Sequence, residues 1–210
     1  MARNLFLVTH AQSEHHVQRV VGGWHDTPLT DLGRRQAGAL AERLAILVGD
    51  DPVDVWSSDL KRAAQTAAAI AARLGVEVRI DADLREKSLG VAEGRPGAWL
   101  EGRVSSTRTD SDRLDHQDGI EGAESRRMVL TRTGRVMEKI LESPCETQIV
   151  VTHGFAVTFL IAAWFALPPE ACGWIGFRPG PGGITHLQQD DHFFDRALLV
   201  FNDRAHLEGL

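Results

Sequence analysis

Two histidines end similar apolar stretches that lie far apart in the sequence. LFLVTH ends at His10 and IVVTH ends at His153, and both runs are rich in the β-branched residues that favour buried strands. A neutral imidazole can act as a nucleophile and a protonated one as a local positive charge. If the two strands were neighbours, both side chains would reach the carboxyl edge of a parallel sheet, where such sheets bind ligands. The repeated context therefore favours one shared site over two unrelated capping or packing histidines.

Two further segments carry groups suited to phosphate chemistry. In SSDLKRAAQTA, Arg62 falls in the first turn of an expected helix, where the helix dipole disfavours a cation unless an anion also binds there. In LREKSLGVAEG, Glu86 is a carboxyl that could donate a proton to a leaving oxygen. Taken alone, either segment is equally typical of a surface arginine or a surface Arg–Glu pair.

The elements that must position these residues alternate between strand and helix. Thr30 or Asp31 would cap the first long helix, and Ser57 and Ser58 the second, which Gly75 would end. The alternation predicts one α/β domain over residues 1–210, a three-layer sandwich with a mostly parallel central sheet flanked by helices. We expect strands over 5–9, 53–56, 76–80, 148–152, 184–188 and 197–201, and helices over 32–48, 59–74, 128–141 and 155–165.

Residues 102–122 do not fit this alternation. The segment is polar and has no clear period. A loop of this length inside a compact domain is typically a lid, a binding loop or a mobile excursion. We expect an insertion that covers a site, with a solvated excursion as the alternative.

Composition restricts the partners of the chain. A net charge of −6 over 210 residues disfavours general binding to nucleic acid or to anionic membranes, although a local pocket can oppose that sign. The sequence has no apolar run long enough to span a bilayer, and we identify no signal peptide. Cys145 and Cys172 lack metal or redox spacing, so we expect reduced thiols in a cytoplasmic protein. A pocket rim or a homodimer contact could be formed by Trp174, Phe177 and the run RPGPGG. Core packing is the simpler role for the two aromatic residues.

Taken in order, the motifs resemble those of the histidine phosphatase superfamily, also called the phosphoglycerate mutase-like family. The similarity extends from residue 5 to about residue 201, and five motifs keep their order. It implies the α/β sandwich of that family. The matching segments are Thr9-His10-Ala11, GWHDTPLT from Gly23, SSDLKRAAQTA from Ser57, LREKSLGVAEG from Leu84, and His153-Gly154.

The resemblance implies a role for each matched residue. His10 would be the nucleophile that becomes phosphorylated, and Arg62 would bind the phosphate. Glu86 would act as the general acid and then as the base that activates water. His153 would contact the transferring phosphoryl group. The resemblance implies no cofactor and no metal, because side chains supply the positive charge.

The sequence departs from the family pattern around the nucleophile. Thr9 stands where the family has an arginine, Ala11 where it has a glycine, and His16 where an asparagine is common. Loss of one preorganised donor in such a site typically costs ~10²–10³ in rate. Arg62, Thr9 and His16 are therefore the expected substrate-binding residues, in an altered pocket.

Several explanations of this departure remain open from the sequence. The substrate could carry its charge differently, or the protein could be a weakly active or inactive one that binds a phosphorylated ligand. A metal could be held by His10, His16, His153 and Glu86. We expect His15 and His25 to be solvated or packing residues. Another cation could replace the arginine, the candidates being His15, His16, Arg19 and Lys87.

We therefore predict a phosphomonoester hydrolase that acts on a small phosphorylated substrate through phosphohistidine at His10. The alternative is a phospho-ligand binding or regulatory protein on the same fold. A mutase is less favoured, because the sequence singles out no second charged substrate site. Trp24, Trp99 and the 102–122 segment are candidates to contact an apolar or sugar-like leaving group.

Overall fold

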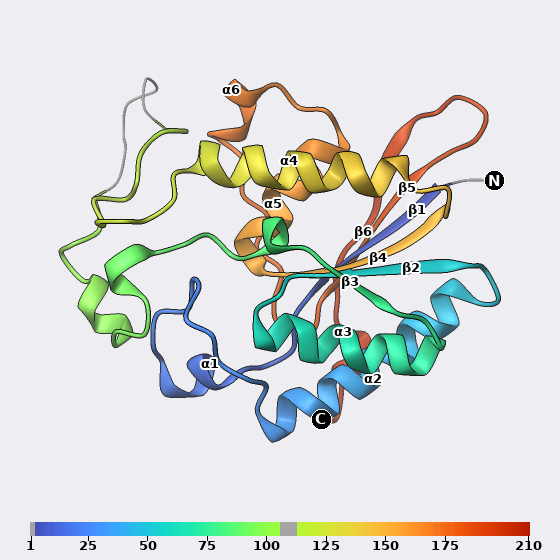
Figure 1. Cartoon of the computed structure of the whole chain (residues 1–210), viewed down its shortest axis with the longest axis horizontal. Helices are drawn as coiled ribbons and strands as arrows, with labels where there is room; N and C mark the ends of the chain where they lie inside the picture. The colour runs from blue at the N-terminus through green and yellow to red at the C-terminus, as the bar shows by residue number, and fades with distance from the viewer. Residues whose placement is uncertain (1–2, 106–112) are drawn as a thin grey trace.

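A six-stranded mixed sheet forms the centre of the computed structural model, which describes residues 3–105 and 113–210 (Figure 1). The strand order is β3-β2-β4-β1-β5-β6. The first four strands in this order are parallel, whereas β5 and β6 are antiparallel to their neighbours, so the expected mostly parallel sheet is confirmed. The strands are β1 (Arg3–Thr9), β2 (Val53–Ser57), β3 (Val78–Ile80), β4 (Thr147–Thr152), β5 (Ile184–Gln189) and β6 (Arg196–Asp203).

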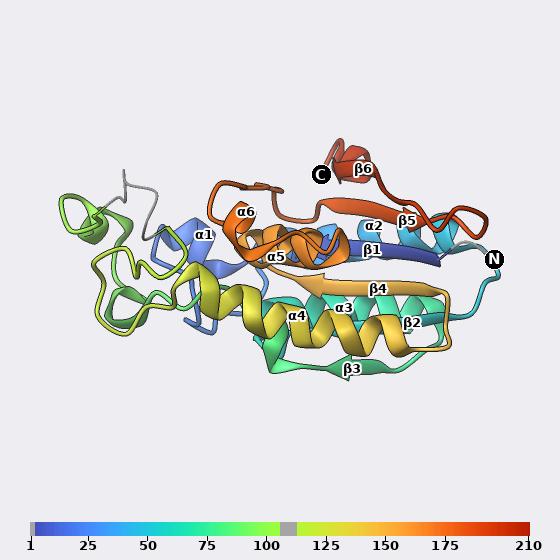
Figure 2. The ribbon, with the colours of Figure 1, turned by 90° about the horizontal axis from the view of Figure 1, so that it is seen from above.

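Helices cover both faces of the sheet and complete the three layers (Figure 2). Helices α2 and α3 lie against one face, and α4 and α5 against the other, as the two largest core clusters show. The short helices α1 and α6 were not expected, because five and four residues give too little periodicity to detect. The helices are α1 (Glu14–Gln18), α2 (Asp31–Val48), α3 (Lys61–Leu74), α4 (Arg126–Glu142), α5 (Gly154–Trp164) and α6 (Pro169–Cys172).

The predicted helix ends are right for α2 and partly wrong for α3. The Thr30 side chain accepts a hydrogen bond from the Gly33 amide at 2.9 Å, as expected of an N-cap. Gly75 ends α3 in the left-handed conformation, with φ of 70°. Helix α3, however, begins two residues later than predicted, and its N-cap position makes no side-chain hydrogen bond. Strand β2 continues through Ser57, and the Ser58 hydroxyl lies within hydrogen-bond distance of His153, directly after β4, so neither serine is the N-cap.

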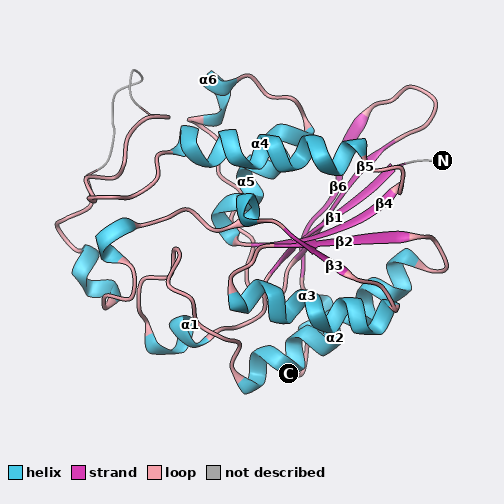
Figure 3. Cartoon of the chain, viewed as in Figure 1, coloured by secondary structure: helices cyan, strands magenta, loops and turns pink. Residues whose placement is uncertain are grey.

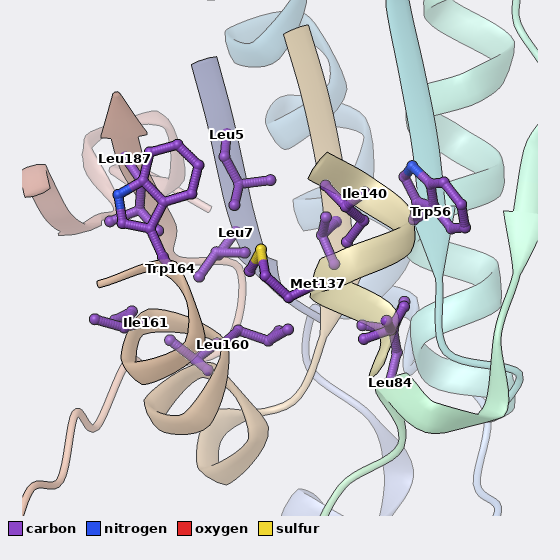
Figure 4. Packing of buried hydrophobic residues seen from close by; sticks show 13 residues of the cluster. Leu5, Leu7, Trp56, Leu84, Met137, Ile140, Leu160, Ile161, Trp164 and Leu187 are labelled. Carbon is purple, nitrogen blue, oxygen red and sulfur yellow. The ribbon is translucent and has the colours of Figure 1, made fainter. Parts of the chain in front are cut away.

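The strands of the centre are buried on both faces because their side chains alternate between the two helical layers. Leu5 and Leu7 of β1 pack towards α4 and α5, together with Met137 and Trp164 (Figure 4). Residues 6 and 8 of the same strand pack towards α2 and α3. Strand β4 is buried along its whole length, so its register is fixed by packing on two sides as well as by hydrogen bonds.

The pairing of β1 with β4 brings the two histidine motifs together. The strands are parallel, with Thr9 opposite Thr152, so the chain leaves both strands at the same edge of the sheet. The backbone amide of His10 continues the ladder by donating to the Thr152 carbonyl at 3.0 Å. At this edge lie α1 and the loops between β3 and α4 (Figure 3).

Described residues of the 102–122 segment, which was expected to be an insertion, pack against the rest of the domain. Leu114 packs in a cluster with Phe159 and Cys172, and Ile120 packs with Val21 and other apolar residues of the neighbouring loops. Residues 106–112 of this segment lie outside the described residues. No helix in the described part of the chain is both long and apolar enough to cross a membrane.

Candidate active site

A pocket of about 390 Å³ opens at the carboxyl edge of the parallel strands. Five of the six residues singled out from the sequence line it, and the sixth, His153, is fully buried next to it. The ring centroids of His10 and His153 are 5.0 Å apart, in an edge-to-face arrangement. The structure thus brings all six together. The five that line the pocket are Thr9, His10, His16, Arg62 and Glu86.

Hydrogen bonds fix the tautomer of His10. Its Nδ1 lies 2.8 Å from the carbonyl oxygen of Ala11, which can only accept, so Nδ1 carries the proton. The lone pair is then on Nε2, and the Arg62 Nε–H donates to it at 3.2 Å. Burial, and secondly the charge of Arg62, lower the pKa of His10 well below its usual value. The ring is therefore neutral, with a nucleophilic nitrogen at the pocket.

Arg62 is held in a fixed orientation by the GWHD segment. Its side chain is 1% exposed, and its Nη1 and Nη2 donate to the carbonyls of His25 at 2.9 Å and Gly23 at 2.6 Å. Gly23 has φ of +55°, and a Cβ there would lie 2.7 Å from a Glu93 oxygen, so the turn requires glycine. A guanidinium anchored in this way presents its remaining N–H groups at a set position beside His10.

His153 is supported by a serine from the end of β2. Its Nε2 lies 2.9 Å from the Ser58 hydroxyl, whereas its buried Nδ1 has no hydrogen-bond partner in the part of the chain that the structure describes. Burial, and then the charges of His10 and Arg62, lower the pKa of His153 well below its usual value. A buried polar atom without a partner is costly, so Nδ1 is a group that a bound oxyanion can satisfy.

The carboxyl group of Glu86 lies at the N-terminus of α5. Oε2 accepts from the Phe155 amide at 3.1 Å, and Oε1 accepts from the amides of Lys87 at 2.9 Å and Ala156 at 3.3 Å. Burial raises the pKa of Glu86, although these amides and the charge of Arg62 act in the opposite direction. A raised pKa favours the protonated form of a carboxyl, which is the form that can donate a proton.

A buried arginine that the sequence did not single out holds the Glu86 loop in place. Arg132 of α4 pairs with Glu124, with its Nε and Nη2 each 2.9 Å from a carboxylate oxygen. The same guanidinium donates to the backbone carbonyls of Asp83, Arg85 and Glu86 at 2.6–2.9 Å. Arg132 is eight residues from Glu124 and far from Glu86, so no local sequence pattern marks this arrangement.

Comparisons with known proteins agree with this geometry. Residues 5–203 match the family model described as histidine phosphatase superfamily (branch 1). The chain belongs to the histidine phosphatase superfamily. The family and fold expected from the five motifs are therefore confirmed.

Individual relatives of this histidine phosphatase are named as phosphatases or mutases. The chain is 34% identical over 201 residues to a glucosyl-3-phosphoglycerate phosphatase of Mycobacterium tuberculosis, covering 91% of this chain and 87% of the relative. It is 32% identical over 168 residues to a probable phosphoglycerate mutase of Yersinia enterocolitica, covering 80% and 77%. A solved mycobacterial glucosyl-3-phosphoglycerate phosphatase in complex with VO3 has a TM-score of 0.78 at 29% identity, covering 96% of this chain and 100% of that one. A phosphatase is the enzyme class that these relatives support.

Thr9 forms part of the pocket wall beside His10. Thr9 is 4% exposed, and its hydroxyl oxygen has no hydrogen-bond partner among the described residues. Ala11 is fully buried, and its amide donates to the Thr66 hydroxyl at 3.2 Å. The wall therefore offers one unpaired hydroxyl where the family motif has a cation.

Two further histidines stand next to His10. The His16 ring is stacked on His10 with centroids 5.5 Å apart, and the His15 centroid is 6.0 Å from His10. The Ser13 amide donates to His16 Nδ1 at 3.2 Å, so a neutral His16 carries its proton on Nε2. Burial, and then the charge of His16, lower the pKa of His15 to about 3. His15 lines the pocket, and its Nδ1 also lies 2.9 Å from the Ser13 hydroxyl and 3.2 Å from that of Thr27, so the side chain has packing contacts as well.

Of the four candidates for a substitute cation, three line the pocket. These are His15, His16 and Lys87, whereas Arg19 ends α1 and is not among the lining residues. Lys87 is only 5% exposed and pairs with Asp118. Within residues 3–105 and 113–210, no group of three or more His, Cys, Asp or Glu side chains is arranged to hold a metal ion.

The tryptophans expected at the leaving-group side do not line the pocket. Trp24 donates from Nε1 to the Glu86 carbonyl at 2.7 Å, and Trp99 packs in a separate apolar cluster. Their place at the wall is taken by other apolar residues. These are Leu89, Phe155, Pro179 and Pro181.

The neutral histidines make the stability of the fold depend on pH. His10, His15 and His153 have lowered pKa values in the folded protein, so the unfolded chain binds more protons below the usual value of 6.5. Their contribution to stability is complete above about pH 6.5 and is lost as the pH falls. Glu86 has the opposite sign, because its raised pKa gives a contribution that declines as the pH rises. Burial also lowers the pKa of His16, His186 and His206, so six histidines oppose one carboxyl group and we expect the net effect to follow the histidines.

We predict a falling melting temperature between pH 7.5 and pH 5.5, measured by thermal unfolding in buffers of equal ionic strength. Replacing one of the three groups, as in His15→Asn, should make the fall smaller. A melting temperature that stays constant over this range would show that these histidines do not remain neutral in the folded state.

Proposed function

We propose that the protein is a phosphomonoester hydrolase that acts through a phosphohistidine at His10 Nε2. The observation that carries the proposal is the fixed tautomer of His10, which leaves the Nε2 lone pair at the pocket beside Arg62. Nucleophile, cation and buried carboxyl then surround one volume that can accept a phosphoryl group. Phosphoryl transfer depends mainly on such positioning and on electrostatic stabilisation.

In the first step His10 Nε2 attacks phosphorus and the bond to the leaving oxygen breaks. Arg62 gives up its hydrogen bond to Nε2 and binds phosphoryl oxygens instead, together with His153 Nδ1 and His16 Nε2–H. Glu86 in its protonated form, which burial favours, donates its proton to the leaving oxygen, and the alcohol departs. Arginine is suited to this role because its fork of N–H groups matches two oxygens.

In the second step water attacks the phosphohistidine. The Glu86 carboxylate formed in the first step accepts a proton from this water, the N–P bond breaks, and inorganic phosphate leaves. His10 regains its Nε2 lone pair and Glu86 regains its proton. Two displacements thus replace one more difficult hydrolysis.

The alternative function is binding without turnover. It is favoured by the changes at Thr9, Ala11 and His16, which all lie around the nucleophile. The hydrolase is supported by the presence of all four groups that would perform the chemistry, which are His10, Arg62, Glu86 and His153. The relatives that are named as phosphatases support it as well. A mutase is the third candidate, supported by the name of the Yersinia relative.

The hydrolase is tested first at the nucleophile. We predict that His10→Ala lowers turnover of 4-nitrophenyl phosphate by orders of magnitude, because removal of a covalent catalyst is not compensated by its neighbours. The matched control is His192→Ala, which removes a histidine from the exposed β5–β6 hairpin. Acid-labile phosphate on the wild type but not on His10→Ala would identify the intermediate. Retention of more than about a tenth of the activity would exclude this mechanism.

The acid is tested by changing the leaving group. We predict that Glu86→Gln slows ethyl phosphate much more than 4-nitrophenyl phosphate, because an alkoxide needs a proton to leave and a nitrophenolate does not. Single-turnover rates should be compared, so that slow dephosphorylation of His10 does not hide the difference. Equal losses on both substrates would argue against Glu86 as the acid. Glu121→Gln, at an exposed position, is the control.

The altered pocket wall is tested by restoring the family residue. We predict that Thr9→Arg leaves turnover unchanged or lower, because His15 and His16 have also been placed beside His10 and a new guanidinium must compete with them. Steady-state rates on 4-nitrophenyl phosphate and inhibition by vanadate are the measurements. A gain of about 10²–10³ in rate with tighter vanadate binding would show instead that the pocket merely lost one cation.

A further inference from the structure

Trp24 links the segment that holds Arg62 to the segment that carries Glu86. Its Nε1–H donates to the Glu86 carbonyl at 2.7 Å. The same carbonyl accepts from Arg132 Nη2 at 2.9 Å, so donors from α4 and from the turn at residues 23–25 hold one oxygen. Two carbonyls of this turn bind the Arg62 guanidinium. One short turn therefore contacts both the cation of the site and the backbone of the acid.

A carboxylate fixes the backbone of this turn. Glu93 Oε1 accepts a hydrogen bond from the Trp24 amide at 2.9 Å. The same oxygen accepts from the Leu89 amide and from the Ser88 hydroxyl, both at 2.9 Å. Ser88 and Leu89 belong to the segment that directly follows Glu86 in the chain. Glu93 thereby joins the turn around Trp24 to the segment that carries the acid.

The main chain next to Glu93 is attached to the residues that precede the turn. The Gly94 amide donates to the Val21 carbonyl at 2.9 Å, and the Val21 amide donates to the Arg95 carbonyl at 2.8 Å. Burial lowers the pKa of Arg62, and the charge of Glu93 is one of those that oppose this effect. The Glu93 carboxylate is therefore held at a defined place between the two segments, where its charge also acts on the cation.

A second connection between the same segments runs through Arg85, which directly precedes Glu86. Its guanidinium carbon lies 4.8 Å from the centre of the Trp24 ring. The same guanidinium pairs with Asp59, with its Nε 2.7 Å from Oδ1. Asp59 lies just before α3, the helix that carries Arg62. The Trp24 ring thus packs against a residue that ties the segment of the acid to the helix of the cation.

We propose that Trp24 and Glu93 are positioning residues that hold the acid Glu86 at a set place relative to Arg62. This inference rests on the proposed function, in which Glu86 protonates the leaving oxygen. Neither Trp24 nor Glu93 is among the residues that line the pocket, so both act through the groups that they hold. A misplacement of about 1 Å at a reacting group can cost ~10² in rate. The competing explanation is that the two residues only stabilise the fold.

Trp24→Phe separates these explanations, because it removes the indole N–H and keeps an aromatic ring beside Arg85. We expect it to lower the single-turnover rate on ethyl phosphate, relative to that on 4-nitrophenyl phosphate, by about 3- to 10-fold. The reason is that only the ethoxide leaving group depends on the proton of Glu86. This ratio of rates is independent of the fraction of folded enzyme, so a loss of stability alone leaves it unchanged.

Glu93 is tested with a disruptive and a conservative substitution. Glu93→Ala removes the oxygen that joins the two segments, and we expect the same ratio to fall by about 10- to 100-fold. Glu93→Gln keeps an acceptor oxygen and should restore the ratio to within about threefold of the wild type. Asp190→Ala is the matched control, because the Asp190 carboxylate also accepts hydrogen bonds from three backbone amides. It lies in the β5–β6 hairpin, which contributes no residue to the pocket lining, so the ratio should stay unchanged.

A double-mutant cycle shows whether Trp24 acts through Glu86. In the Glu86→Gln background the acid is absent, so Trp24→Phe should change the ratio by less than about twofold. A further fall as large as that in the wild type would overturn the proposal, because Trp24 would then act by another route. A ratio that neither Trp24→Phe nor Glu93→Ala changes in the wild-type background would overturn it as well.

An NMR titration keeps the positioning separate from the chemistry. The Phe155 amide donates to Glu86 Oε2 at 3.1 Å, so its proton shift follows the protonation of Glu86. In Glu93→Ala we expect the titration midpoint to move from its raised value towards the usual pKa of a glutamate, because a displaced carboxyl is less buried. This result supports the positioning role even if the wild type hydrolyses no phosphate ester and the proposed function fails. A midpoint that is unchanged in Glu93→Ala would overturn the role, whereas turnover of 4-nitrophenyl phosphate by the wild type bears only on the proposed function.

Discussion

The parallel pairing of β1 with β4 is the constraint on which the candidate site depends. Thr9 stands opposite Thr152, and each strand ends one residue before a histidine. A shift of one residue would turn every side chain of the strand towards the other helical layer, which the apolar packing on both faces prevents. The distance between His10 and His153 is therefore set by the register of a buried sheet, and not by the flexible chain between them.

Burial has opposite effects on the two kinds of titratable group at this site. It lowers the pKa of His10, which favours the neutral imidazole, and it raises the pKa of Glu86, which favours the protonated carboxyl. An imidazole base and a carboxylic acid can thus coexist a short way apart. The Arg132–Glu124 pair maintains this arrangement, because the same guanidinium that is paired inside the protein also holds the backbone of the Glu86 loop. A pair of residues outside the lining of the pocket thereby helps to determine where Glu86 lies.

Local patterns in the sequence predicted the elements that depend on local interactions. The central strands, the long helices, the Thr30 cap and the Gly75 helix end all follow from side chains close in the chain. Ser58 was wrongly expected to cap α3. Its hydroxyl bonds instead to His153, which follows β4 and is distant in the sequence, so only the tertiary fold shows this contact. The family motifs predicted His10 and Glu86 as site residues because each motif is a continuous segment. Arg132 was missed because its contacts with Glu124 and with the Glu86 loop join separate segments.

The strand order also has a consequence for how the chain folds during synthesis. Strand β4 lies between β1 and β2, so the first two strands have no direct contact in the sheet and must wait for residues 147–152. At ordinary rates of translation this interval is on the order of ten seconds. During that time the apolar side chains of β1 and the inner faces of α2 and α3 lack their final partners, which makes the nascent chain a candidate for chaperone binding. The pocket is completed only after residues 147–153 have been made, because β4 joins β1 to β2 and His153 directly follows β4.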